Sequence, residues 1–121
     1  MTGRKRVLIV DDHEAFRVVA RRMLEGAGFQ VVGAVADGET ALAQVDLLRP
    51  DVVLLDIQLP SLDGFLVAAR LAERADAPAV VLTSSRDRDD YGPRIAESKV
   101  AGFIQKGELS AVEFRRVLTS A

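Results

Sequence analysis

The chain has no cysteine and a single histidine among its 121 residues. Without cysteine it can form neither a disulfide framework nor a thiolate zinc site, and this absence fits a reducing compartment. The lone histidine, His13, lacks the partners that a metal site or a catalytic triad would need, so we expect it at the surface. The composition therefore argues against functions built on cysteine or on several histidines.

The chain also lacks a long apolar run and a large excess of either charge. Its basic start is followed by only four apolar residues, 7–10, before two acids, which is too short for a signal peptide or a membrane span. The formal net charge is -2 and the lysines and arginines are scattered, so no basic face is available for nucleic acid. We expect a cytoplasmic protein that neither enters a membrane nor binds nucleic acid directly.

The hydrophobic content of 49% is enough for one compact domain over residues 1–121. Short apolar runs lie at residues 7–10, 31–36, 51–55, 79–82 and 101–104. Each run is nearly continuous rather than alternating in apolar character, as is typical of parallel strands covered on both faces. The sequence therefore predicts five parallel strands.

Helical patterns separate these runs. The first has apolar residues at helical spacing with arginines opposite. Asp37 and Asp63 are placed to cap the second and third helices, and Ser110 precedes Glu113 by three residues, the spacing of a capping box. Between residues 84 and 99 a glycine and a proline interrupt the pattern, so we predict a short, mobile fourth helix.

A five-fold alternation of strand and helix predicts a doubly wound α/β sheet with helices on both faces. In such sheets the functional crevice lies at the carboxyl ends of the strands. The polar side chains at those ends are three acids, two hydroxyls and an amine: Asp11, Asp12, Asp56, Thr83, Ser84 and Lys106. We expect them to converge on one edge.

Each of these residues also has an ordinary explanation. Asp12 alone could be a loop residue or a helix cap, Thr83 a hydroxyl bonded to backbone, and Lys106 a solvated charge. Independent loops have no reason, however, to place complementary groups at the same end of four strands. The combination therefore indicates a shared site.

Four segments carry a family resemblance: "VLIVDDHEAFR", "DVVLLDIQLPSLDG", "VVLTSS" and "AGFIQK". In this order and spacing the chain resembles the receiver domain of two-component response regulators over essentially its whole length. It is most similar to receivers that often precede a helix-turn-helix output domain. The resemblance implies a flavodoxin-like fold with strand order 2-1-3-4-5.

The resemblance also implies that Asp56 accepts a phosphoryl group from a phosphohistidine of a sensor histidine kinase. One Mg²⁺, for which Mn²⁺ could substitute, would be held by Asp11, Asp12, Asp56 and the backbone carbonyl of Gln58, with Asp12 a direct ligand and Asp11 a ligand through water. A hard cation offsets the repulsion between a carboxylate and an anionic phosphoryl group. Oxygen ligands supplemented by water suit Mg²⁺.

In the same family pattern Lys106 pairs with a phosphoryl oxygen, Thr83 hydrogen-bonds another, and the small Ser84 leaves room for the group. Phe103 occupies the aromatic switch position, where many members have tyrosine. Gly107 stands where many have proline. The face formed by the fourth helix, fifth strand and fifth helix would signal to an output domain or partner, and a phosphorylation-dependent dimer is compatible with the family.

The turn after Asp56 contains Pro60 and Gly64. Pro60 would stiffen this turn so that the carbonyl of Gln58 faces the metal, and Gly64 would relieve crowding at the start of the next helix. Proline and glycine are also common in turns that have no functional role, so this explanation stays open.

Two other functions remain to be separated from phosphoryl acceptance. Phosphatases of the haloacid dehalogenase type also use a strand-end aspartate with Mg²⁺, but they need a second acid two residues later, where this chain has Gln58. A receiver-like module that acts by binding alone would be expected to have lost at least one of Asp12, Asp56, Thr83 and Lys106. We therefore expect a switch rather than an enzyme.

Overall fold

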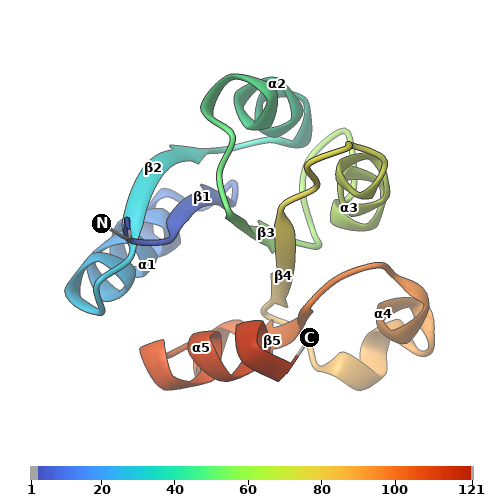
Figure 1. The fold of residues 1–121 in the computed structure, drawn as a ribbon. Helices are drawn as coiled ribbons and strands as arrows, with labels where there is room; N and C mark the ends of the chain where they lie inside the picture. Colours follow the sequence, from blue (N-terminus) through green and yellow to red (C-terminus); the bar gives the residue numbers. More distant parts are fainter. Residues whose placement is uncertain (1–2, 121) are drawn as a thin grey trace.

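Five parallel strands form the sheet of the computed structural model, which describes residues 3–120 (Figure 1). The strands are β1 (Arg6–Val10), β2 (Gln30–Val35), β3 (Val52–Asp56), β4 (Ala79–Ser84) and β5 (Gly102–Gln105). Their order across the sheet is β2-β1-β3-β4-β5. The predicted flavodoxin-like topology is confirmed, and each predicted strand is found within two residues of its expected bounds.

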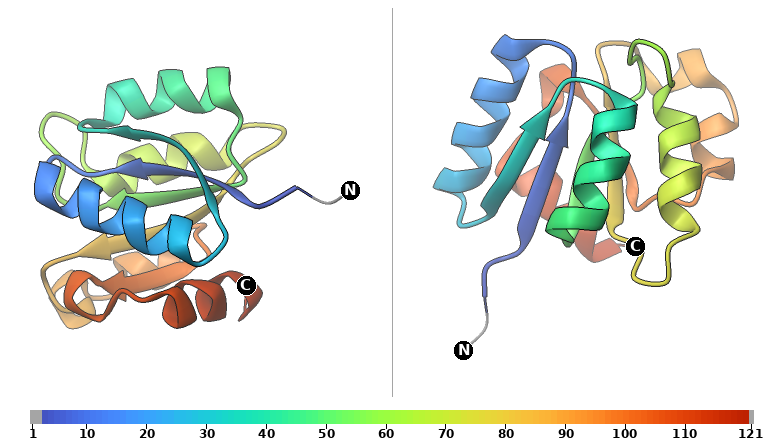
Figure 2. Two further views of the ribbon diagram at one scale, coloured as in Figure 1. Left: turned by 90° about the vertical axis from the view of Figure 1, so that its left-hand side faces the viewer. Right: turned by 90° about the horizontal axis from the view of Figure 1, so that it is seen from above.

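Helices cover both faces of this sheet (Figures 1 and 2). One face carries α1 (Glu14–Gly26) and α5 (Ala111–Ser120), and the other carries α2 (Gly38–Leu48), α3 (Gly64–Ala72) and α4 (Arg94–Glu97). Two 3-10 turns, η1 (Arg88–Tyr91) and η2 (Lys106–Glu108), precede α4 and α5.

The strands divide the core into two layers because successive side chains point to opposite faces. In β1, Val7 and Ile9 pack beneath α1 and α5, while Leu8 and Val10 pack beneath α2 and α3. All four side chains are fully buried. A strand buried on both faces has no place for polar residues, which explains the continuous apolar runs in the sequence.

The predicted caps are present. Asp37, Asp63 and Ser110 each accept a hydrogen bond from the backbone N–H three residues further along the chain, at 2.7, 2.9 and 3.1 Å. The fourth helix is short, as predicted: Gly92, with a positive φ of 57°, and Pro93 delay its start, and the backbone is extended again at Ser98. Its mobility stays a prediction.

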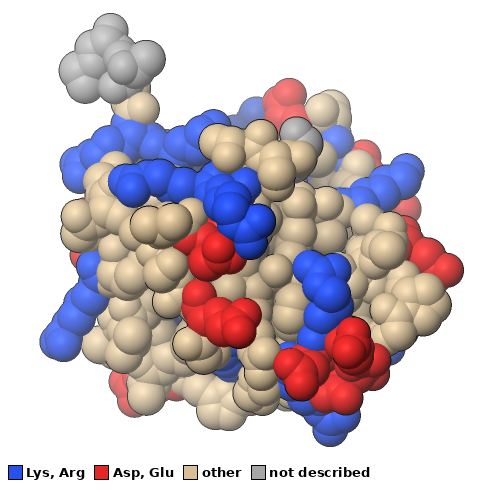
Figure 3. Space-filling view, turned by 90° about the horizontal axis from the view of Figure 1, so that it is seen from below, with Lys and Arg blue, Asp and Glu red and all other residues tan. Residues whose placement is uncertain are grey.

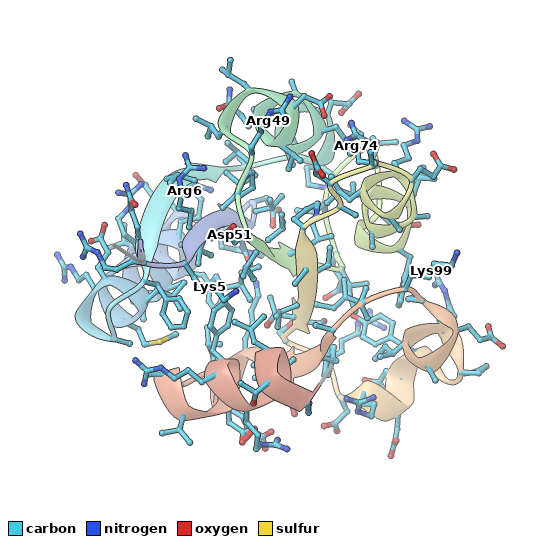
Figure 4. All side chains as sticks on the ribbon, in the orientation of Figure 1. Lys5, Arg6, Arg49, Asp51, Arg74 and Lys99 are labelled. Carbon is cyan, nitrogen blue, oxygen red and sulfur yellow. The ribbon has the colours of Figure 1, made fainter. Side chains whose placement is uncertain are left out.

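The opposite end of the sheet, where the strands begin, is held by arginines (Figure 4). The backbone N–H of Arg6 donates to Asp51 Oδ2 at 2.8 Å, and its guanidinium Nη1 donates to the carbonyl oxygens of Leu48 and Arg49 at 2.6 and 2.9 Å. These contacts satisfy carbonyl groups at the end of α2 that have no partner within the helix. Arg6 therefore connects the start of β1 to the end of α2 and to the residue before β3.

The same end holds a hollow of about 590 Å³ between the ends of α2 and α3. Its acids and arginines pair with one another, as in the contact of Arg74 with Asp46 at 2.9 Å. The hollow lies away from the carboxyl ends of the strands, so its size does not mark the functional site. Over residues 3–120 we find no helix with the length and apolar character that crossing a membrane requires.

Candidate functional site at the carboxyl ends of the strands

The structure brings the predicted polar residues together at one edge of the sheet. Asp11 follows β1, Asp56 ends β3, and Thr83 and Ser84 end β4. Lys106 follows β5 directly and opens the turn η2. The convergence that we expected from strand ends alone is therefore present.

Lys106 connects the two buried acids of this edge. Its Nζ lies 2.7 Å from Asp11 Oδ2 and 3.3 Å from Asp56 Oδ2. The side chains of Asp11 and Asp56 are 0% and 1% exposed, and that of Lys106 only 15%. The contact with Asp56 is a hydrogen bond, whereas the contact with Asp11 is an ion pair without hydrogen-bond alignment. Lys106 is thus not the solvated surface charge of the ordinary explanation.

The pKa of Asp56 is raised from 3.8 to about 6, chiefly because burial disfavours the charged carboxylate. The backbone N–H of Gln58, which donates to Asp56 Oδ1 at 3.0 Å, lowers this pKa. The negative charge of Asp11 raises it, and the ammonium of Lys106 lowers it. Asp56 is therefore an acid held in an unfavourable environment that a further positive charge would relieve.

Burial alone would lower the pKa of Lys106, but the carboxylates of Asp11 and Asp56 outweigh it and raise the pKa. Lys106 therefore stays cationic at neutral pH. A fixed ammonium beside a strand-end carboxylate is suited to bind an anion there.

Asp12 and His13 extend the acidic group toward solvent. His13 is exposed, as we predicted, but it does not lack partners: its Nδ1 lies 3.2 Å from both Asp11 Oδ1 and Asp12 Oδ1. One ligand atom each from Asp11, Asp12, His13 and Asp56 falls within 4.8 Å of the others. This mainly carboxylate set, partly buried and partly open, fits a hard divalent cation that keeps some of its water.

Thr83 lies opposite Asp56 in the register of β3 and β4. Its hydroxyl is fully buried and has no hydrogen-bond partner among the described residues. A buried hydroxyl without a partner is costly and therefore uncommon. The ordinary explanation of a hydroxyl bonded to backbone is wrong, and the Thr83 O–H is free to donate to a group bound at the site.

The turn after Asp56 depends on Gly64. A Cβ at this position would lie 2.4 Å from the carbonyl oxygen of Asp56 and 2.6 Å from the Cα of Ile57. The backbone N–H of Gly64 also donates to Ile57 O at 2.8 Å. Pro60 lies in the same turn, before Ser61, whose φ is 66°. Gly64 therefore permits a close approach of two backbone segments that no side chain would allow.

The sequence did not point to Tyr91, which contacts this edge from η1. Its hydroxyl lies 2.5 Å from Ser84 Oγ, which also accepts a hydrogen bond from the N–H of Arg86 at 3.0 Å. The Tyr91 ring packs against Phe103, with centroids 6.2 Å apart, and Phe103 is largely buried on β5. Sequence periodicity does not reveal a contact between an irregular segment and a strand end. A lone tyrosine in a polar stretch was the one weak sign of this contact in the sequence.

The chain matches the family described as the response regulator receiver domain over residues 7–115. It is 38% identical to the transcriptional regulatory protein PdtaR of Mycobacterium tuberculosis over an alignment of 122 positions, gaps included. This alignment covers 93% of this chain and 60% of PdtaR. It is 47% identical to the positive alginate biosynthesis regulatory protein of Pseudomonas aeruginosa over 102 residues, covering 83% of this chain and 40% of that protein. The chain thus spans about half the length of these relatives.

Solved receiver domains have the same fold. The signal receiver domain of NarL from Mycobacterium tuberculosis superposes with a TM-score of 0.84 at 31% identity, covering 98% of this chain and 94% of that one. The signal receiver domain of a modulated diguanylate cyclase from Desulfovibrio desulfuricans gives the same TM-score and identity, with 98% and 93% coverage.

Proposed function

This chain belongs to the response regulator receiver domains, and from that premise we propose that it is a switch whose Asp56 accepts a phosphoryl group. Receiver domains of two-component systems work with histidine kinases and output domains and are generally signalling switches. The finer statement, that Asp56 is the acceptor in a Mg²⁺-dependent transfer from a phosphohistidine, is our proposal.

One observation carries it: Lys106 Nζ lies 3.3 Å from Asp56 Oδ2 while the adjacent Thr83 hydroxyl has no partner among the described residues. An acceptor site needs a nucleophile, a cation to receive the negative charge, and a donor for the incoming oxygens. Asp56, Lys106 and Thr83 supply these three groups at one strand edge.

In the transfer, an oxygen of the Asp56 carboxylate forms a bond to phosphorus as the phosphorus–nitrogen bond of the phosphohistidine breaks. The imidazole nitrogen of the kinase keeps the electron pair of that bond and takes a proton. Lys106 can then pair with one phosphoryl oxygen and Thr83 can donate to another. The aspartyl phosphate that results is the signal.

Asp11, Asp12 and Asp56, which each offer an oxygen within 4.8 Å of the others, would hold Mg²⁺, or Mn²⁺ in its place. The backbone carbonyl of Gln58 would complete this set of ligands. When bound, the cation supplies positive charge that offsets the repulsion between carboxylate and phosphoryl group. Burial of Asp11 and Asp56 keeps two of these carboxylates in place before any ligand arrives.

The surface that would report the signal is formed by α4, β5 and α5. Basic and acidic residues are interspersed on this side of the molecule (Figure 3). Val112, at the start of α5, is 73% exposed. We propose that phosphorylation changes this surface for an output domain or partner protein, with a phosphorylation-dependent dimer as one form of output.

Intact-mass analysis tests the proposal. Incubation with acetyl phosphate and Mg²⁺ is expected to add one phosphoryl group to the wild type and none to Asp56→Asn. Asp76→Asn, which alters a side chain 89% exposed at the other end of the sheet, is the matched control and is expected to take up the group normally.

The same experiment separates the proposal from a binding module that is never phosphorylated. Such a module would gain no mass in the wild type under any condition. Undiminished labelling of Asp56→Asn would instead place the acceptor on another residue.

A further inference from the structure

Tyr91 joins the phosphoryl site to an aromatic cluster outside it. On one side its hydroxyl contacts Ser84 Oγ at 2.5 Å. On the other side its ring lies 5.7 Å from that of Phe65 in α3 and 6.2 Å from that of Phe103 in β5, both measured between centroids. One residue thus connects the end of β4 with side chains of two further elements.

The hydrogen bonds around Ser84 favour one direction for this contact. Ser84 Oγ accepts from the backbone N–H of Arg86 at 3.0 Å and is placed to donate its own proton to Gln58 Oε1 at 3.4 Å. A hydroxyl has one donor and two acceptor positions, so while Ser84 donates to Gln58 its remaining position accepts from the O–H of Tyr91. The contact with Gln58 is the longest of the three and therefore the weakest.

We infer that Tyr91 is a positioning residue that transmits occupancy of the phosphoryl site, through Ser84, to Phe65 and Phe103. This inference rests on the proposed function, because it needs a phosphoryl group on Asp56. Ser84 reaches this site through Gln58, whose backbone N–H donates to Asp56 Oδ1 at 3.0 Å. An anionic phosphoryl oxygen is a stronger acceptor than Gln58 Oε1, so the Ser84 hydroxyl turns toward it and its contact with Tyr91 lengthens.

The backbone around Tyr91 permits such a movement. Tyr91 is the last residue of η1, and Gly92, with φ of 57°, and Pro93 separate it from α4. Among the described residues, Tyr91 therefore belongs to a short 3-10 turn and to no α-helix. The partly exposed ring can shift at low cost, whereas the fully buried Ser84 cannot leave its strand.

The composition supplies a direct readout. Tyr91 is the only tyrosine and the chain has no tryptophan, so tyrosine fluorescence reports this residue alone. We expect beryllofluoride with Mg²⁺, as a phosphoryl mimic, to shift the emission of the wild type and to leave that of Asp56→Asn unchanged. Ser84→Ala is expected to lose the shift, and the matched control Ser85→Ala, altered at the exposed neighbouring position, to keep it.

Tyr91→Phe provides a second test that does not depend on folding of the Ser84 variant. It is expected to gain one phosphoryl group from acetyl phosphate like the wild type, but to lose the change in amide exchange over residues 88–103. An unchanged Tyr91 emission in a sample that gains the phosphoryl mass overturns the inference and leaves the proposed function intact, as does an undiminished exchange response in Tyr91→Phe. Absence of the mass gain overturns the proposed function and the inference together.

Discussion

Replacing Asp56 with asparagine is expected to stabilise the metal-free protein at neutral pH. The pKa of Asp56 is raised from 3.8 to about 6, so the folded state holds the neutral acid more tightly than the unfolded state does. Stability from this group is therefore fully present below pH 3.8 and is lost as the pH rises through 6. Asparagine has a similar shape and carries no charge at any of these pH values.

The size of the effect follows from the same two values. A difference of one pH unit in pKa corresponds to about 1.4 kcal/mol, so ionised Asp56 lowers the free energy of unfolding by on the order of 3 kcal/mol. For a domain of this length, that difference raises the melting temperature of Asp56→Asn by roughly 10 °C. The stability gap should be full above pH 7 and should close as the pH falls below 4.

Urea denaturation followed by circular dichroism, with a chelator present, measures this gap at pH 7.5 and pH 4. Asp76→Asn removes one negative charge from an exposed side chain and serves as the control, with a much smaller effect on the free energy of unfolding. The reasoning would be refuted if Asp56→Asn and the wild type had the same free energy of unfolding at pH 7.5. It would also be refuted if they differed equally at both pH values, because the difference would then not come from ionisation of Asp56.

Three further predictions concern the groups around Asp56. Gly64→Ala should lower the free energy of unfolding by about 3 kcal/mol in urea denaturation, because its Cβ would lie 2.4 Å from the carbonyl oxygen of Asp56. Gly107→Ala should lower it by less than about 1 kcal/mol, because apart from the neighbouring residues of the chain no heavy atom lies within 4 Å of the added Cβ. Lys106→Met should lower the free energy of unfolding by about 3 kcal/mol at pH 7.5 and by less at pH 5, where Asp56 is mostly protonated. Equal losses at the two pH values would contradict an ion pair between Lys106 and Asp56. Mg²⁺ at 100 times its Kd should raise the free energy of unfolding by about 2.7 kcal/mol. Asp12→Ala should remove most of this stabilisation in thermal melts.

The sequence predicted the sheet and the position of its site because both depend on local patterns. Runs buried on both faces must be continuous in apolar residues, and the carboxyl ends of parallel strands must share an edge. These two rules were enough to place Asp56, Thr83 and Lys106 together. The caps at Asp37 and Asp63 followed from the geometry of helix ends.

The remaining features depend on tertiary contacts that no local pattern records. The 2.5 Å contact of Tyr91 with Ser84 joins an irregular segment to a strand end. That the Thr83 hydroxyl has no hydrogen-bond partner within residues 3–120 depends on the packing of the neighbours around it. His13 was expected to be exposed, which is correct, but its contacts with Asp11 and Asp12 depend on the turn that begins α1.

The central claim is that Asp56 itself carries the phosphoryl group. An acyl phosphate is reduced by borohydride to the alcohol, which converts the modified aspartate to homoserine and marks its position permanently. After incubation with acetyl phosphate and Mg²⁺, reduction and proteolysis, peptide mass spectrometry should find homoserine at position 56 and at no other acid. Homoserine at Asp11 or Asp12 instead, or none at any aspartate while the unmodified peptides are recovered, would contradict the claim.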